Sequence, residues 1–237
     1  MEVNLKIFLN SIFFILFGLS SFAQKDSISI KKQWLKSSIA PTLLMSGSLY
    51  TLNKNVPFNK YDVQQKIQAK YPNFHSEVDD YILYIPIAIP YILDWSMKGY
   101  AKNDFINRSI LLAKSQLIMM GIVYPLKYTT KMIRPDGRAT NSYPSGHTAQ
   151  AFMAATFMHK ELKHKSYWYS IGAYSIATIV GGYRMLNNRH WISDVFAGAA
   201  IGILSTEIAY LTHQYKWGKR ENSVSFRFTP IFYTSLD

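Results

Sequence analysis

Two histidines in this chain have neighbours that can prepare an imidazole for chemistry. The first, His190, stands four residues before Asp194, which is one helical turn. On a helix the carboxylate would accept a hydrogen bond from one ring nitrogen and leave the other basic, as in a nucleophile or a general base. Arg184, six residues upstream, can return to the same pocket as a guanidinium. Two metal ligands fall short of a site, and the other histidines have no spacing that completes one, so we expect no metal.

The second histidine, His147, stands where a helix is expected to begin. It follows Pro144, Ser145 and Gly146 and precedes a run of small and apolar residues. Serine is a preferred N-cap, glycine lets the backbone approach a ligand closely, and the first amides of a helix form an anion site. We therefore expect Ser145 and the Gly146 amide to hold an anion with His147 beside it. A capped helix with an exposed histidine is the alternative.

Two cations precede this stretch. Lys127 and Arg134 are seven residues apart, two helical turns, so we expect them on one face of a helix that Pro135 ends. The arginine fork matches two phosphate oxygens, and lysine adds a compact positive charge. A solvated basic helix end is the alternative for this fragment alone.

The three clusters follow one another in an order typical of a known family. K-x6-R-P from Lys127, P-S-G-H from Pro144 and R-x5-H-x3-D from Arg184 resemble the signature of the type 2 phosphatidic acid phosphatases. That superfamily also contains bacterial acid phosphatases and vanadium-dependent haloperoxidases. The chain departs from the family at Tyr183, where a serine commonly precedes the arginine. This departure puts a supporting contact in doubt and leaves the arginine, histidine and aspartate intact.

The resemblance implies roles for the matching positions. His190 would attack phosphorus and form a phosphohistidine, oriented by Asp194, and His147 would protonate the leaving alkoxide. The phosphoryl oxygens would be held by the remaining residues of the motifs, which are Lys127, Arg134, Ser145, Gly146 and Arg184. No metal or other cofactor is required by the resemblance.

The elements that must position these residues are expected to be helices. Six apolar stretches of moderate length are rich in Ala, Leu, Ile and Met and rarely alternate as strands do. The pattern predicts an all-α fold, and the resemblance implies a bundle of about six core helices with the phosphate site at one end. The stretch without a charge over residues 166–183 is the best candidate for a membrane span. The six stretches lie at residues 39–52, 81–93, 109–126, 147–158, 166–183 and 195–212.

The amino terminus has the pattern of an export signal. An apolar core and a small-residue site predict a signal peptide over residues 1–23, with an uncleaved membrane anchor as the alternative. We expect a polar segment at 24–38, the helical phosphatase domain at 39–215 and a tail at 216–237. The protein would be exported to the cell envelope, periplasmic or membrane-associated, with its site facing the periplasm.

Composition limits the partners. The absence of cysteine excludes disulfides, thiolate catalysis and cysteine-ligated metals. Lys plus Arg (26) exceeds Asp plus Glu (14) by 12, which suits a phosphate ester, an acidic lipid surface or nucleic acid. Because the cations that matter gather in the motifs of an exported chain, we expect no nucleic-acid partner. The oligomeric state is not indicated.

We therefore expect a metal-independent phosphatase that hydrolyses a phosphate or diphosphate ester of a lipid. The export signal, the apolar helices and the basic excess favour a lipid. The low mean hydropathy of −0.03 favours the alternative, a periplasmic acid phosphatase acting on soluble monoesters. A vanadium haloperoxidase and a non-catalytic membrane protein are further alternatives.

Overall fold

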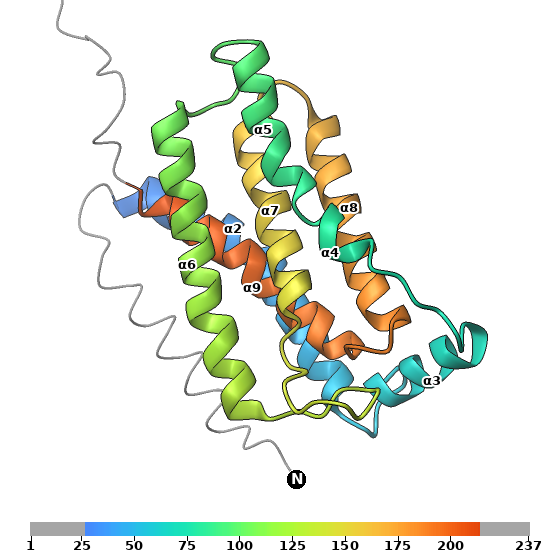
Figure 1. Ribbon diagram of the computed structural model, residues 1–237. Coiled ribbons are helices and arrows are strands. Elements are labelled where there is room, and N and C mark those ends of the chain that lie inside the picture. The colour runs from blue at the N-terminus through green and yellow to red at the C-terminus, as the bar shows by residue number, and fades with distance from the viewer. Residues whose placement is uncertain (1–26, 214–237) are drawn as a thin grey trace, which may run out of the picture.

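The computed structural model describes residues 27–213, and within that range the chain forms helices and no strand. The expectation of an all-α fold is confirmed (Figure 1). The expected signal peptide (1–23) and the expected tail (216–237) lie outside the described residues. The helices are α2 (Ser27–Leu52), α3 (Lys60–Lys70), α4 (Asp79–Ile82), α5 (Ile85–Ser96), α6 (Phe105–Thr130), α7 (Gly146–Leu162), α8 (Tyr167–Leu186) and α9 (Ile192–Leu211).

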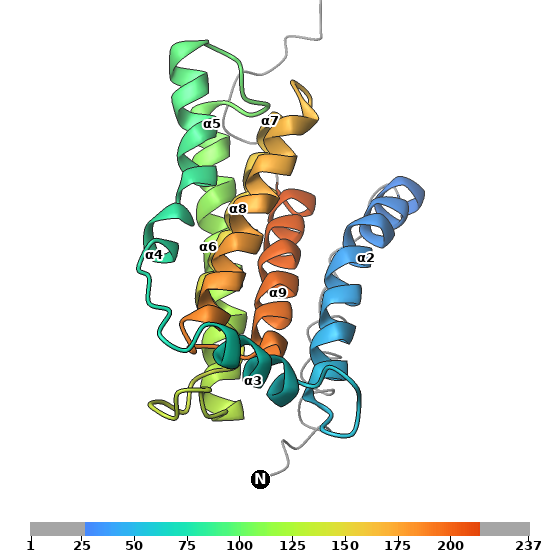
Figure 2. The ribbon, with the colours of Figure 1, turned by 90° about the vertical axis from the view of Figure 1, so that its right-hand side faces the viewer.

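Helix α7 lies at the centre of the bundle. It packs against α5, α6, α8 and α9, and α9 packs in turn against α2 and α6. Figures 1 and 2 show α5, α6, α7 and α8 running side by side, with α2 lying along the side of α9 away from them. Helices α7 and α9 therefore form the centre of the bundle, and the other helices pack around them.

The close approach of α7 and α9 depends on two glycines. A Cβ atom built on Gly198 would lie 2.5 Å from the carbonyl oxygen of Ser145, and one on Gly202 would lie 2.3 Å from that of Ala149. Neither contact is possible for a real side chain, so only glycine permits this packing. The helices touch at the N-terminus of α7, where Ser145 precedes Gly146.

The apolar stretches at 39–52, 109–126 and 147–158 lie within single helices, and those at 166–183 and 195–212 extend one residue beyond theirs. The stretch at 81–93 is divided between α4 and α5 by Leu83 and Tyr84, and one helix was not expected. Helix α3 begins after Asn59, whose side-chain oxygen accepts hydrogen bonds from the amides of Tyr61 and Asp62. Its sequence, KYDVQQKIQAK, is mostly polar, so no apolar stretch predicts it. The domain boundary placed between residues 38 and 39 falls inside α2, which continues through it.

Two helices of the described chain are long and apolar enough to cross a membrane, judged by length and composition alone: α6 and α9. Helix α8, which covers all but the first residue of the expected span 166–183, is not one of them, so this criterion does not support that expectation. Its serines, glycines and tyrosines lower its hydropathy. Helix α9 is mostly buried in the bundle, whereas α6 leaves apolar side chains such as Leu117 and Tyr128 exposed.

Candidate active site

The residues singled out from the sequence come together at one end of the bundle. This end contains the C-terminus of α6, the 131–145 loop, the N-terminus of α7, the turn from α8 to α9, and α3 (lower part of Figure 1). Its loops are joined by the indole nitrogen of Trp191, which donates a hydrogen bond of 2.8 Å to the carbonyl oxygen of Ile133. The end of the bundle expected to hold the site is thus the end that gathers the three motifs.

The first motif does not form one helical face. Helix α6 ends at Thr130, Lys131 adopts a left-handed conformation (φ 44°), and Arg134 lies in the following loop. The expected helix through Lys127 and Arg134 is therefore wrong. Both cations nevertheless meet at Asn141: the lysine Nζ lies 2.7 Å from its carbonyl oxygen and the arginine Nε 3.1 Å from its Oδ1. A loop asparagine that the sequence did not single out brings the two charges together.

The second motif forms the helix start that was expected. Ser145 is the N-cap of α7, and its Oγ accepts hydrogen bonds from the amide (3.4 Å) and the hydroxyl (2.9 Å) of Thr148. Ser145 itself is completely buried. Gly146 lies beside the lysine of the first motif, because a Cβ built on it would be 3.7 Å from Lys127 Cε. The Lys127 side chain thus lies next to the first amides of α7.

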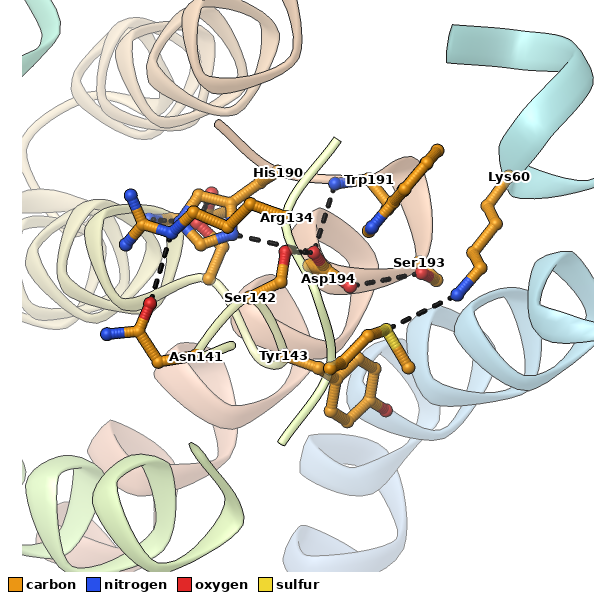
Figure 3. A network of polar contacts seen from close by, with 12 residues as sticks. Lys60, Arg134, Asn141, Ser142, Tyr143, His190, Trp191, Ser193 and Asp194 are labelled. Carbon is orange, nitrogen blue, oxygen red and sulfur yellow. Dashed lines mark hydrogen bonds and ion pairs between the residues drawn. The ribbon is translucent and has the colours of Figure 1, made fainter. Parts of the chain in front are cut away.

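Asp194 is the centre of a buried network that joins the motifs (Figure 3). Its Oδ2 accepts hydrogen bonds from Ser142 Oγ (2.5 Å) and from the Trp191 amide (3.0 Å), and its Oδ1 accepts one from Ser193 Oγ (3.1 Å). Its carbonyl oxygen accepts from the amide of Ser145 at 3.0 Å. Through these contacts the aspartate connects the start of α9 to the start of α7.

The pair of His190 and Asp194 forms, although not on one helix. Helix α9 begins at Ile192 and His190 precedes it, so the two residues do not lie on one helical turn. Instead the Asp194 side chain accepts a hydrogen bond from the amide of the N-cap residue Trp191. The histidine Nδ1 lies 3.5 Å from Asp194 Oδ2. This is an ion-pair distance and too long for a well-formed hydrogen bond, and within the described chain this nitrogen has no hydrogen-bond acceptor.

Burial keeps the His190 imidazole neutral. The residue is 1% exposed, and desolvation lowers the pKa of His190 to about 4, with Asp194 opposing the shift and the Lys127 and Arg184 charges adding to it. A neutral imidazole is the form that can attack an electrophile. The two cations that act on its pKa are those that would hold a bound anion.

Arg184 and His147 meet at carboxylates that the sequence did not single out. Arg184 Nη1 lies 2.8 Å from Asp79 Oδ2 and 3.2 Å from Asp80 Oδ1, at the start of α4. The same Asp80 oxygen lies 2.9 Å from His147 Nε2. Burial and the Arg184 charge lower the pKa of His147, while the two aspartates oppose this shift. Arg184 Nε is buried with no hydrogen-bond partner among the described residues.

The end of the bundle therefore contains a cationic cradle with two imidazole and carboxylate pairs around it. In residues 27–213, no group of three or more His, Asp or Glu side chains is placed to hold a metal ion. Sequence reasoning missed Asp79, Asp80, Asn141 and Ser142, because none belongs to a motif. The partners of the two aspartates and of Ser142 are also distant in the chain.

Comparison with known families agrees with this arrangement. The sequence model of the PAP2 superfamily matches residues 121–218, a segment that contains the three motifs. We refer to this matched part of the chain, residues 121–218, as the PAP2 segment. Asp79 and Asp80 lie outside this PAP2 segment.

The chain is also similar to a curated protein. The chain is 40% identical over 142 residues to lipid A 1-phosphatase of Porphyromonas gingivalis, and the alignment covers 58% of this chain and 31% of that protein. The chain therefore spans less than a third of the length of this relative.

Two solved structures resemble this protein. A PAP2 type phosphatidylglycerolphosphate phosphatase from Bacillus subtilis is 23% identical, with a TM-score of 0.50 over 72% of this chain and 94% of that one. Aquifex aeolicus LpxE is 22% identical, with a TM-score of 0.46 over 62% of this chain and 93% of that one. The first of these likenesses shows that the fold is shared.

The departure at Tyr183 has a structural counterpart. The ring of Tyr183 packs against that of Phe74, with ring centroids 5.5 Å apart. Phe74 belongs to the segment that leads into α4. The residue before the arginine of the third motif of the PAP2 segment therefore holds in place the segment that carries Asp79 and Asp80.

Proposed function

We propose that the protein is a phosphatase that hydrolyses the phosphate ester of a lipid through a phosphohistidine on His190. The observation that carries the proposal is the geometry of that residue: a buried, neutral imidazole paired with Asp194 beside the cations Lys127 and Arg184. Positioning and charge neutralisation supply most of the catalysis in phosphoryl transfer, and this end of the bundle offers both.

The phosphoryl group would be held by three charges and one helix start. Lys127, Arg134 and Arg184 would neutralise its oxygens, with the unpartnered Arg184 Nε as one donor. Ser145 and the Gly146 amide, at the N-terminus of α7, would complete the cradle. A bound metal has no part in this mechanism.

The reaction would proceed in two steps. The neutral ring of His190 attacks phosphorus as the bond to the leaving oxygen breaks, and His147 gives that oxygen its proton. Water then attacks the phosphohistidine, with His147 accepting a proton from it, and inorganic phosphate leaves. One histidine acts as the nucleophile and the other as the acid and then the base.

A lipid is the preferred substrate class for two reasons. The curated relative from Porphyromonas gingivalis is named for an activity on lipid A, and the exposed apolar side chains of α6 and α8 provide a surface for a membrane. Among the largest of these are Leu117, Tyr128 and Trp168, each at least 70% exposed. We infer that the protein acts at a membrane of the cell envelope, with the site end facing the periplasm.

The test is phosphate release in detergent, with a chelator present, from lipid A, phosphatidate, polyprenyl diphosphate and a soluble aryl phosphate. We expect release from at least one lipid and little from the aryl ester. His190→Ala is expected to lose about a thousandfold or more of this activity, because it removes the attacking atom. Release from the aryl ester alone would favour the soluble acid phosphatase, and none from any ester by the folded protein would refute the proposal.

A further inference from the structure

Beyond the three motifs, one carboxylate touches two residues of the proposed site. Asp80 Oδ1 lies 2.9 Å from His147 Nε2 and 3.2 Å from Arg184 Nη1. It stands 67 residues before the histidine, in the short helix α4, and outside the PAP2 segment. Its side chain is 46% exposed and that of His147 is 40% exposed, so the pair lies at the open side of the site.

We propose that Asp80 is the positioning residue of the general acid, holding the His147 ring by Nε2 so that Nδ1 delivers the proton to the leaving oxygen. This inference rests on the proposed function. The site would then contain two imidazole and carboxylate pairs with separate tasks: Asp194 serves the nucleophile His190, and Asp80 serves the acid.

The hydrogen bond decides which ring nitrogen is free. Because Nε2 donates to Asp80, the other nitrogen of the charged ring, Nδ1, remains as the donor for the substrate. During the first step the Nδ1 proton moves to the leaving oxygen as the bond between phosphorus and oxygen breaks. The ring becomes neutral, and its Nε2 proton stays on the hydrogen bond to Asp80.

The charges around His147 explain why an acid at this place needs a carboxylate. The groups that act on it are Arg184 from α8 and the aspartates Asp79 and Asp80 from α4. Burial and the guanidinium disfavour the charged ring, and the aspartates oppose them. Since Asp79 directs its Oδ2 to Arg184 at 2.8 Å, Asp80 is the aspartate that contacts the imidazole directly.

Other contacts keep Asp80 in place. Asn187 Nδ2 donates to the carbonyl oxygen of Ser76 at 2.8 Å, and the Ser76 amide donates to Asn187 Oδ1 at 3.0 Å. With the packing of Phe74 on Tyr183, these bonds attach the segment before α4 to the third motif. These contacts thus fix the position of the segment from which Asp80 extends.

The test compares Asp80→Asn with wild type and with a matched control, Glu77→Gln, which removes an exposed carboxylate three residues away. The readout is kcat/KM against pH for an ester with an alkoxide leaving group, because this ratio reports groups of the free enzyme. We expect Asp80→Asn to lower kcat/KM near neutral pH by about tenfold or more, as part of the factor of about 10² to 10⁴ that a general acid contributes. Its alkaline limb should move to lower pH, and Glu77→Gln should match wild type.

A second substrate separates an acid role from a structural one. A dinitrophenyl phosphate has a leaving group that needs no proton, so even if wild type turns this aryl ester over slowly, the loss in Asp80→Asn should largely disappear with it. Equal losses on both esters, an unmoved alkaline limb or a rise in kcat/KM would overturn the inference. Asp80→Glu, which keeps the charge, is expected to recover part of the activity.

The pairing can also be measured without turnover. An NMR titration of His147 in the resting protein, assigned with His147→Ala, should show a lower pKa in Asp80→Asn than in wild type. An unchanged pKa would overturn the inference. If wild type released no phosphate from any ester, the proposed function would fail, whereas an active wild type matched by Asp80→Asn would contradict only the role of Asp80.

Discussion

The two histidines of the site differ in environment, and this difference assigns their tasks. His190 is buried and paired with a carboxylate that is itself buried and hydrogen-bonded, so its ring stays neutral. His147 is partly exposed and contacts a partly exposed carboxylate, which supports its charged form. Two imidazoles at one end of a bundle can therefore act as nucleophile and acid at the same pH.

The pH dependence of kcat/KM follows from these environments. The nucleophile must be neutral, and since the pKa of His190 is about 4, its activity should be lost only as the pH falls through about 4. The acid must be protonated, and because the pKa of His147 lies below its usual 6.5, activity should decline as the pH rises toward and past that value. We expect a maximum between about pH 4 and 6.5, measured at saturating detergent and constant ionic strength. A maximum above pH 8 would contradict these assignments.

Among the elements, α7 and α9 hold the two halves of the site at a fixed separation. Their backbones touch at Gly198 and Gly202, and the amide of Ser145 donates to the carbonyl oxygen of Asp194. The proposed phosphate cradle at the start of α7 and the proposed nucleophile before α9 are therefore placed by one helix contact. Helix α4 adds the carboxylates from another part of the chain.

Gly198→Ala should damage the site directly. Its new methyl group would lie 2.5 Å from the Ser145 carbonyl oxygen, so the N-terminus of α7 must shift away from α9. We expect phosphate release to fall by more than about tenfold, because misplacement by about 1 Å costs up to about a hundredfold. The control is Gly172→Ala in α8, where nothing lies within 4 Å of the added atom. Equal activity of the two variants would contradict the tight contact.

The ion pair between Asp79 and Arg184 gives a prediction about stability. Asp79 is completely buried and Arg184 is nearly so, and removing one partner of such a pair leaves the other uncompensated. Asp79→Asn should therefore lower the free energy of unfolding by up to about 3 kcal/mol. This is near the low end of the range for broken buried ion pairs, because Asp80 still contacts the guanidinium. Thermal unfolding in detergent, with Glu77→Gln as the control, measures this loss of stability. A melting temperature equal to that of the control would show that this pair contributes little.

At the scale of the whole molecule, exposed apolar side chains gather on one helix although the mean hydropathy of the chain is only −0.03. Helix α6 carries exposed side chains at Leu117, Met120, Tyr124 and Tyr128, spaced so that they follow one helical face. The basic excess and this stripe both suit a membrane with anionic lipids. The arrangement places an apolar flank beside the end that holds the site.

The stripe should determine binding to lipid. Replacing Leu117 and Tyr124 by glutamate puts two charges on the exposed face of α6 and should reduce the fraction of protein recovered with anionic vesicles several-fold. Thr129→Glu, at the end of the same helix, adds a charge away from this pair and serves as the control. Undiminished flotation of the double variant with vesicles would show that another surface binds the membrane.

The sequence by itself predicted the all-α class, most of the apolar helical segments and the eight candidate site residues within the three motifs, because helical composition and motif spacing are local properties of the chain. The tertiary structure decided where α6 ends, how Arg134 reaches Asn141, and that His190 precedes its helix. It alone paired Asp80 with His147 and Asp79 with Arg184. Each of these contacts joins residues more than 60 positions apart, and no local pattern encodes such a meeting, because it depends on how helices pack.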